Sequence, residues 1–218
     1  MTKKSKPMRD QTRTACTNHI QHFTDTTTTT TTTASAPAYT QLLLGDSHTE
    51  RLEWKFPLLA LKQTLLCGCG GDRISQLAWR ISNTENLGYT QNDAMKSASF
   101  ERIGILIGTN NISEKSLSEK QINAMVDQVS SMVQLVKETW PGALVTVFPL
   151  PPIPTRGRSK RDQATVDAYN QALRDKGLLQ DYIHWPEMDL ELDFEDEVHL
   201  SETGYLKWRE MVRTAGFE

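Results

Sequence analysis

Two short blocks, far apart along the chain, carry residue types that could together perform nucleophilic catalysis. The first is Gly-Asp-Ser-His at positions 45–48, where a serine beside a turn-forming glycine can present its hydroxyl to a cleft and attack a carbonyl. The second is Asp-Glu-Val-His at positions 196–199, where the aspartate can accept the imidazole Nδ1 proton and leave Nε2 as a base. Each block taken alone is equally compatible with an ordinary turn or with surface residues.

His199 is the histidine best placed to act as the base, because Asp196 stands three residues before it. The other histidines lie in the polar N-terminal segment, next to the serine in sequence, or at the end of a predicted strand: His19, His22, His48 and His184. The sequence therefore favours His199, oriented by Asp196, as the group that would deprotonate Ser47.

A glycine cluster and a pair of asparagines supply neutral hydrogen-bond donors. Three of the four residues at 68–71 are glycine, and such a segment lets backbone amides point into a cleft, as a developing oxyanion requires. A phosphate-binding loop is less compatible, since its Lys-Ser/Thr ending is missing, while a simple tight turn stays open. The side chain of Asn110, which is followed by Asn111, can donate to an oxyanion or cap a neighbouring turn.

Short apolar runs alternate with longer amphipathic stretches from residue 39 onward, which is typical of βαβ units on a parallel sheet. The predicted strands cover residues 40–44, 62–67, 100–107, 144–148 and 182–184, and the predicted helices cover 73–81, 118–139, 162–175 and 202–213. This order predicts a three-layer αβα sandwich. In such folds ligands bind beyond the carboxyl ends of the strands, where the serine, glycine and asparagine blocks lie.

Residues 1–38 are polar and include an unbroken run of threonines from Thr26 to Thr33. Low-complexity polar sequence has little apolar surface to offset the entropy lost on ordering. We therefore expect a disordered leader over 1–38 and a single α/β domain over 39–218.

Composition limits the partners and the compartment. The 218 residues have a net charge of -3, which gives no global electrostatic basis for nucleic-acid binding. The three cysteines form neither a disulfide framework nor a metal-binding spacing. Because no apolar run suits a signal peptide or a transmembrane segment, we expect a soluble, cytoplasmic protein.

The blocks at 45–48, 68–72, 108–111 and 196–199, in that order, resemble the SGNH (GDSL-type) hydrolase family, whose name lists their serine, glycine, asparagine and histidine. The likeness to the catalytic subunits of intracellular platelet-activating factor acetylhydrolase extends to Leu-Ala-Trp-Arg at 77–80. The resemblance implies a flavodoxin-like fold with a five-stranded parallel sheet. It also implies a catalytic triad of Ser47, Asp196 and His199, and an oxyanion hole formed by the backbone amides of Ser47 and Gly71 and the side chain of Asn110. No metal or cofactor is implied.

The function implied by the resemblance is hydrolysis of short-chain, acetyl-like esters, with a role in lipid metabolism. Two alternatives stay open: a carbohydrate O-acetylesterase, and a retrotransposon-derived esterase domain serving an RNA–protein particle or a membrane. The second is compatible with the threonine-repeat leader, because some fish non-LTR retrotransposons carry a similar domain. Homodimerisation also stays open. His48 replaces an apolar residue common in the family, and Arg73 replaces a small hydroxyl residue, so the resemblance leaves the substrate undetermined.

Overall fold

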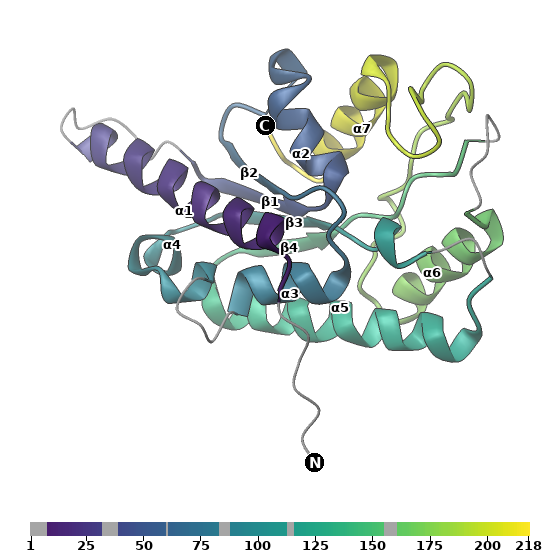
Figure 1. Cartoon of the computed structure of the whole chain (residues 1–218), viewed down its shortest axis with the longest axis horizontal. Coiled ribbons are helices and arrows are strands. Elements are labelled where there is room, and N and C mark those ends of the chain that lie inside the picture. The colour runs from purple at the N-terminus through teal and green to yellow at the C-terminus, as the bar shows by residue number, and fades with distance from the viewer. Residues whose placement is uncertain (1–7, 32–38, 60, 83–87, 113–115, 155–160) are drawn as a thin grey trace.

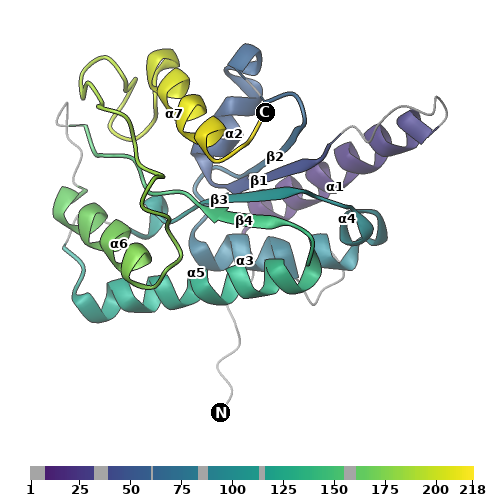
Figure 2. The same cartoon turned by 180° about the vertical axis from the view of Figure 1, so that it is seen from behind.

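The computed structural model describes residues 8–31, 39–59, 61–82, 88–112, 116–154 and 161–218. A parallel sheet lies between two layers of helices, as Figure 1 shows. The helices α2 (Ser47–Trp54) and α7 (Glu202–Thr214) cover one face, and α3 (Ile74–Ser82), α5 (Glu119–Thr139) and α6 (Gln163–Asp175) lie on the other (Figure 2). This arrangement confirms the predicted αβα sandwich.

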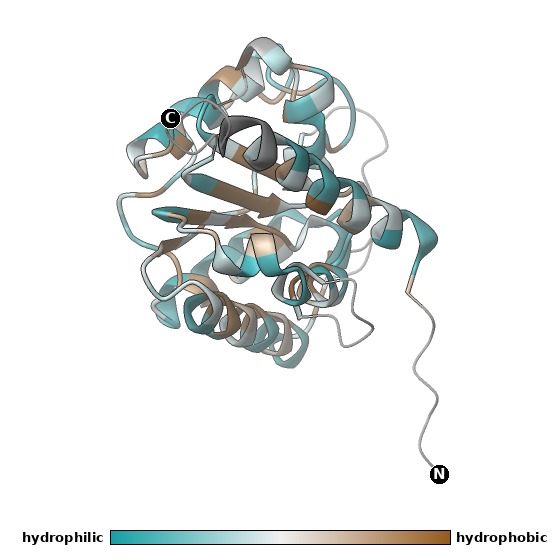
Figure 3. Cartoon of the chain, turned by 90° about the vertical axis from the view of Figure 1, so that its left-hand side faces the viewer, coloured by the Kyte–Doolittle hydropathy of each residue, from teal (hydrophilic) through white to brown (hydrophobic). Residues whose placement is uncertain are grey.

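Four strands form the sheet: β1 (Gln41–Gly45), β2 (Thr64–Gly68), β3 (Arg102–Leu106) and β4 (Leu144–Val147), in the order β2-β1-β3-β4. The register places Gly45 at the end of β1 opposite Gly68 of β2 and Leu106 of β3. The chain passes from β1 to β2 on one side of it, and from β2 it crosses back to β3 on the other side. A topological switch point therefore lies at the carboxyl end of β1. Every residue of β1 and β2 is buried, and the apolar strands stand out at the centre of Figure 3.

The predicted fifth strand at residues 182–184 is wrong. No ladder pairs this segment with β4 within the residues that the structure describes. Instead, side chains attach it to the domain: Ile183 is fully buried, and the indole Nε1 of Trp185 donates to the Pro149 carbonyl at 2.9 Å. An apolar anchor in a loop produces the same short pattern as a strand.

The predicted helices agree with α3, α5, α6 and α7 to within one residue at each end. The longest, α5, begins after Ser118, whose backbone amide donates to the Gln121 side chain at 3.0 Å. Its buried residues recur at steps of three and four, as the sequence indicates: Ile122, Met125, Val126, Val129, Met132, Val133 and Val136. Short elements that were not predicted are α2, α4 (Asp93–Ser97) and three 3₁₀ turns at Pro57–Leu59, Tyr89–Gln91 and Thr109–Asn111.

The prediction of a disordered leader is wrong for the residues that are described, because α1 (Asp10–Thr31) is a helix of 22 residues. It contacts β2, α3 and α4 along the β2 edge of the sheet (Figure 1). Its buried residues follow steps of four, three and four along one face: Thr12, Cys16, His19 and Phe23. This short stripe is surrounded by threonines and is hidden by the composition of the segment. Residues 1–7 and 32–38, also included in that prediction, lie outside the described residues, and the predicted domain of 39–218 omits α1.

Candidate active site

Ser47 stands at the switch point, as the first residue of α2 directly after β1. The Asp46 side chain caps this helix by accepting a hydrogen bond from the His48 amide at 3.1 Å. Asp46 is a good cap because its carboxylate takes one of the amides that the first helical turn leaves without a partner. The Ser47 side chain is thereby held at the carboxyl edge of the sheet, where 8% of the residue's surface is exposed.

The loop between α6 and α7 brings the predicted acid and base to this serine. His199 Nε2 lies 3.1 Å from Ser47 Oγ, and His199 Nδ1 lies 2.7 Å from Asp196 Oδ2. The other Asp196 oxygen accepts the backbone amides of Val198 at 2.8 Å and His199 at 2.7 Å. All three predicted residues are therefore within hydrogen-bonding distance in one relay, although 152 residues separate the serine from the histidine.

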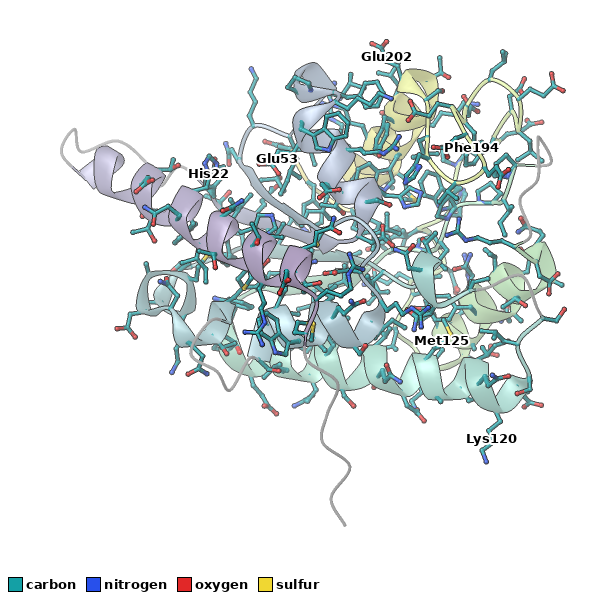
Figure 4. All side chains as sticks on the ribbon, in the orientation of Figure 1. His22, Glu53, Lys120, Met125, Phe194 and Glu202 are labelled. Atoms are coloured by element: carbon teal, nitrogen blue, oxygen red, sulfur yellow. The ribbon has the colours of Figure 1, made fainter. Side chains whose placement is uncertain are left out.

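Backbone hydrogen bonds across the base of the loop fix the positions of Asp196 and His199. Phe194 and Leu200 form an isolated antiparallel bridge, and the Glu195 amide donates to the His199 carbonyl at 2.9 Å. Figure 4 labels Phe194 in this loop, next to α7. Arg51 of α2 forms an ion pair with Glu195, so the loop is also attached to the helix that begins with the serine.

Burial and charge set the protonation of the relay. Partial burial lowers the pKa of His199 below its usual value; hydrogen bonding to Asp196 opposes this, and charge on His48 adds to it. Partial burial alone would raise the pKa of Asp196, but hydrogen bonds from the His199 backbone, the imidazole and the Val198 backbone outweigh it, and the pKa is lowered. At neutral pH the pair is therefore a carboxylate and a neutral imidazole, the state in which Nε2 can accept a proton.

His48, which replaces an apolar residue common in the family, is fully buried beside the relay. Its Nδ1 lies 3.1 Å from Asp46 Oδ1, and its Nε2 lies 3.1 Å from the Val198 carbonyl. The ring thus connects the residue before Ser47 to the residue before His199. The departure from an apolar residue at this position was the only sequence signal of this role.

Three donors face no acceptor among the described residues: the backbone amides of Ser47 and Gly71, and one of the two hydrogens on Asn110 Nδ2. The other Asn110 hydrogen is donated to the Asp72 carbonyl at 3.0 Å, which fixes the amide plane. Gly71 has φ +74°, a left-handed conformation that favours glycine. Neighbouring Asn111 points elsewhere, since its Oδ1 accepts the Ile74 amide at the start of α3 at 3.0 Å.

A buried ion pair lies behind these donors. Arg80 and Asp72 have fully buried side chains, and Arg80 Nε donates to Asp72 Oδ2 at 2.9 Å. The same guanidinium donates from Nη1 to the Cys67 carbonyl at 2.9 Å and from Nη2 to the Gly45 carbonyl at 2.6 Å. Arg80 therefore ties the carboxyl ends of β1 and β2 to the loop that follows β2. Apart from the family-like motif at 77–80, no sequence pattern indicates that Arg80 joins these strand ends to the loop.

A small apolar pocket with a cavity volume of about 20 Å³ adjoins the relay. Thr109 and Val198, the neighbours of Asn110 and His199, lie in its wall, and Arg161 and Glu197 also line it. The remaining lining is apolar: Ile112, Leu150, Pro151, Pro152, Ile153, Pro154 and Val166.

The family model that describes the GDSL-like Lipase/Acylhydrolase family matches residues 23–207 of the chain. The chain belongs to this family. Members are hydrolases that act on carboxylic esters, and this chain is therefore a carboxylic ester hydrolase of the SGNH type. The match begins at Phe23, so it includes α1 from that residue to its end at Thr31.

Solved structures share the fold of this GDSL-like hydrolase. A Streptococcus pneumonia protein whose name refers to platelet activating factor is 18% identical, with a TM-score of 0.67 over 94% of this chain and 92% of the other. A GDSL-like lipase from Bacteroides thetaiotaomicron is 14% identical, with a TM-score of 0.57 over 90% and 97% of the two chains. An acetyl xylan esterase is 15% identical, with a TM-score of 0.53 over 80% and 98%. A search of curated proteins found no match. Within the described residues, no helix has the length and apolar character needed to cross a membrane.

Proposed function

We propose that this GDSL-like hydrolase cleaves short-chain, acetyl-like carboxylic esters through an acyl-enzyme on Ser47. The observation that carries the proposal is the continuous relay from Ser47 Oγ to His199 Nε2 at 3.1 Å and from His199 Nδ1 to Asp196 Oδ2 at 2.7 Å. A serine hydroxyl is a weak nucleophile unless a positioned base takes its proton as it attacks.

In the first half-reaction, Ser47 Oγ attacks the ester carbonyl while its proton passes to His199 Nε2. Asp196 stabilises the resulting imidazolium, and the carbonyl oxygen gains negative charge within reach of the amides of Ser47 and Gly71 and the side chain of Asn110. His199 then gives the proton to the departing alkoxide. In the second half-reaction, His199 takes a proton from water, which attacks the acyl group and releases the acid and the free serine.

The preference for a short acyl group rests on the apolar pocket beside the relay. Its cavity volume is about 20 Å³, little more than the roughly 10–15 Å³ that a single water needs. Four residues of its wall, at 151–154, belong to a proline-rich segment with few rotatable bonds. An acyl group has to displace this wall to enter, and a short group such as acetyl displaces it least.

A fluorophosphonate probe tests the nucleophile. The probe should label the wild-type chain at Ser47, and Ser47→Ala should abolish both labelling and ester hydrolysis while the melting temperature stays within a few degrees of wild type. Ser131→Ala is a matched control, since Ser131 lies on α5 and donates only to the Asp127 carbonyl of its own helix at 3.0 Å. Undiminished labelling of the Ser47→Ala protein would contradict the mechanism.

Nitrophenyl esters of increasing acyl length test the acyl preference, and kcat/KM should fall as the chain lengthens beyond a few carbons. An O-acetylated sugar and an acetylated phospholipid, assayed beside them, distinguish the two classes of alcohol. A preference for long acyl chains would contradict the proposed substrate class without affecting the role of Ser47.

A further inference from the structure

Arg9, at the residue before α1, reaches the glycine loop that follows β2. Its Nη1 donates to the Gly71 carbonyl at 2.7 Å and its Nη2 donates to the Gly70 carbonyl at 3.0 Å. Nη2 also donates to the Gln11 side chain at 2.6 Å, which restrains the guanidinium plane. One planar fork thus holds two successive carbonyls of a loop 62 residues away in the sequence.

Holding the Gly70 carbonyl also fixes the direction of the Gly71 amide. The two groups belong to one planar peptide unit, and in a trans peptide the C=O and N–H bonds point in opposite directions. No peptide bond between the described residues is cis. Because Arg9 lies on the carbonyl side of this unit, the Gly71 N–H points away from Arg9, and it meets no acceptor among the described residues.

The loop needs such a restraint from outside, because glycine has more backbone freedom than any other residue. Gly71 is exposed and has no side chain of its own to anchor it. A second contact from α1 holds the next residue, since Thr12 Oγ1 donates to Asp72 Oδ1 at 2.7 Å in a buried position. The first turn of α1 therefore touches the loop at three consecutive residues, 70 to 72.

We propose that Arg9 is a positioning residue for ester hydrolysis: it aims the Gly71 amide at the oxyanion. This inference rests on the proposed function, in which Gly71 N–H is one of the oxyanion donors. Arg9 does not touch substrate and acts only through the peptide unit between Gly70 and Gly71. The N-terminal segment then contributes to turnover as well as to folding.

The test compares Arg9→Ala with Arg13→Ala in the full chain. Arg13 lies one helical turn further along α1, and its guanidinium lies 5.3 Å from the centre of the Trp79 ring on α3. Both variants lose a cation and a contact between α1 and the domain, but only the first frees the loop. Removing one oxyanion donor entirely costs 10²- to 10³-fold in kcat. A donor that is present but misaligned should cost less, so we expect Arg9→Ala to lose roughly 10- to 100-fold in kcat with little change in KM.

A boronic acid inhibitor gives a second readout, because its tetrahedral adduct with the serine places an oxygen where the oxyanion would lie. Its inhibition constant should rise in Arg9→Ala in proportion to the loss of kcat and should stay near wild type in Arg13→Ala. Arg9→Lys retains the charge but offers a single nitrogen to the two carbonyls, so it should recover only part of kcat. It also serves as the test variant if Arg9→Ala does not fold.

Unchanged kcat in a folded Arg9→Ala protein would overturn the inference. So would an equal loss in Arg13→Ala, which would assign the effect to the docking of α1 in general, or full recovery in Arg9→Lys, which would assign it to charge. Failure of the proposed function is seen separately, as a wild-type chain whose Ser47 does not react with the fluorophosphonate probe.

Discussion

Replacing Arg80 by methionine should destabilise the fold strongly. Methionine keeps an unbranched apolar stem but removes the guanidinium, so the fully buried Asp72 carboxylate loses its ion pair and keeps the hydrogen bond from the Thr12 hydroxyl. The carbonyls of Gly45 and Cys67 lose a donor at the same time. Removing one partner of a buried ion pair costs 3–5 kcal/mol, because the remaining charge is left desolvated and unpaired. We therefore expect the free energy of unfolding to fall by about 3–5 kcal/mol.

Urea unfolding followed by circular dichroism measures this loss as a lower midpoint at an unchanged slope. For a chain of this size, each kcal/mol lowers the melting temperature by about 2–4 °C, so a fall of roughly 6–20 °C should accompany it. Lys176→Met is the matched control: its pair with Asp127 is 3.1 Å long but 51% and 66% exposed, and such surface pairs contribute about 0–1 kcal/mol. The double variant with Asp72→Ala should be less destabilised than the sum of the two single variants, since it leaves no isolated charge. A cost below about 1 kcal/mol for Arg80→Met would refute the reasoning.

Two further predictions concern catalysis. Asn110→Ala should lose on the order of 10²- to 10³-fold in kcat with little change in KM. Asn111→Ala, which removes the acceptor for the Ile74 amide, should instead cost ~1 kcal/mol of stability and leave kcat nearly intact. Steady-state kinetics and thermal melts on both variants distinguish the two roles, and near wild-type turnover by Asn110→Ala would exclude the oxyanion role. His199 must be neutral to accept a proton, and burial lowers its pKa. On lowering the pH, kcat/KM for an uncharged ester should therefore fall with a midpoint below the ordinary histidine pKa of about 6.5. A midpoint above that value would contradict the role of His199 as the base.

The sequence predicted the layers and the relay because both depend on local patterns. Buried apolar runs end where the polar blocks begin, which located the ends of β1, β2 and β3 to within two residues. Asp196 and His199 lie three residues apart in one loop, so their contact could be predicted from the local sequence. The fold then brings this loop to Ser47.

What was missed depends on contacts between distant segments. The four buried residues of α1 indicate a packed helix only when the sheet edge that covers them is known. The low-complexity composition of the segment conceals their spacing. Arg9 contacts a loop 62 residues away, and His48 contacts a carbonyl 150 residues away, so neither partner leaves a periodic signal. The absent fifth strand shows the opposite error, in which a locally plausible pattern finds no neighbouring strand to pair with.

The contacts of α1 are distributed unevenly along its length, and this determines how the helix opens. Among the described side chains, the buried ones lie between Thr12 and Phe23. Thr24, Thr26 and Thr27 beyond them each donate to a carbonyl of their own helix, as when Thr27 Oγ1 donates to the Phe23 carbonyl at 2.9 Å. Threonine has a low helix propensity, so the backbone amides should exchange with solvent deuterium most slowly around Cys16 and progressively faster toward the C-terminal end. Fraying or proteolytic trimming would then shorten the helix from its threonine end while the first turn stayed on the glycine loop.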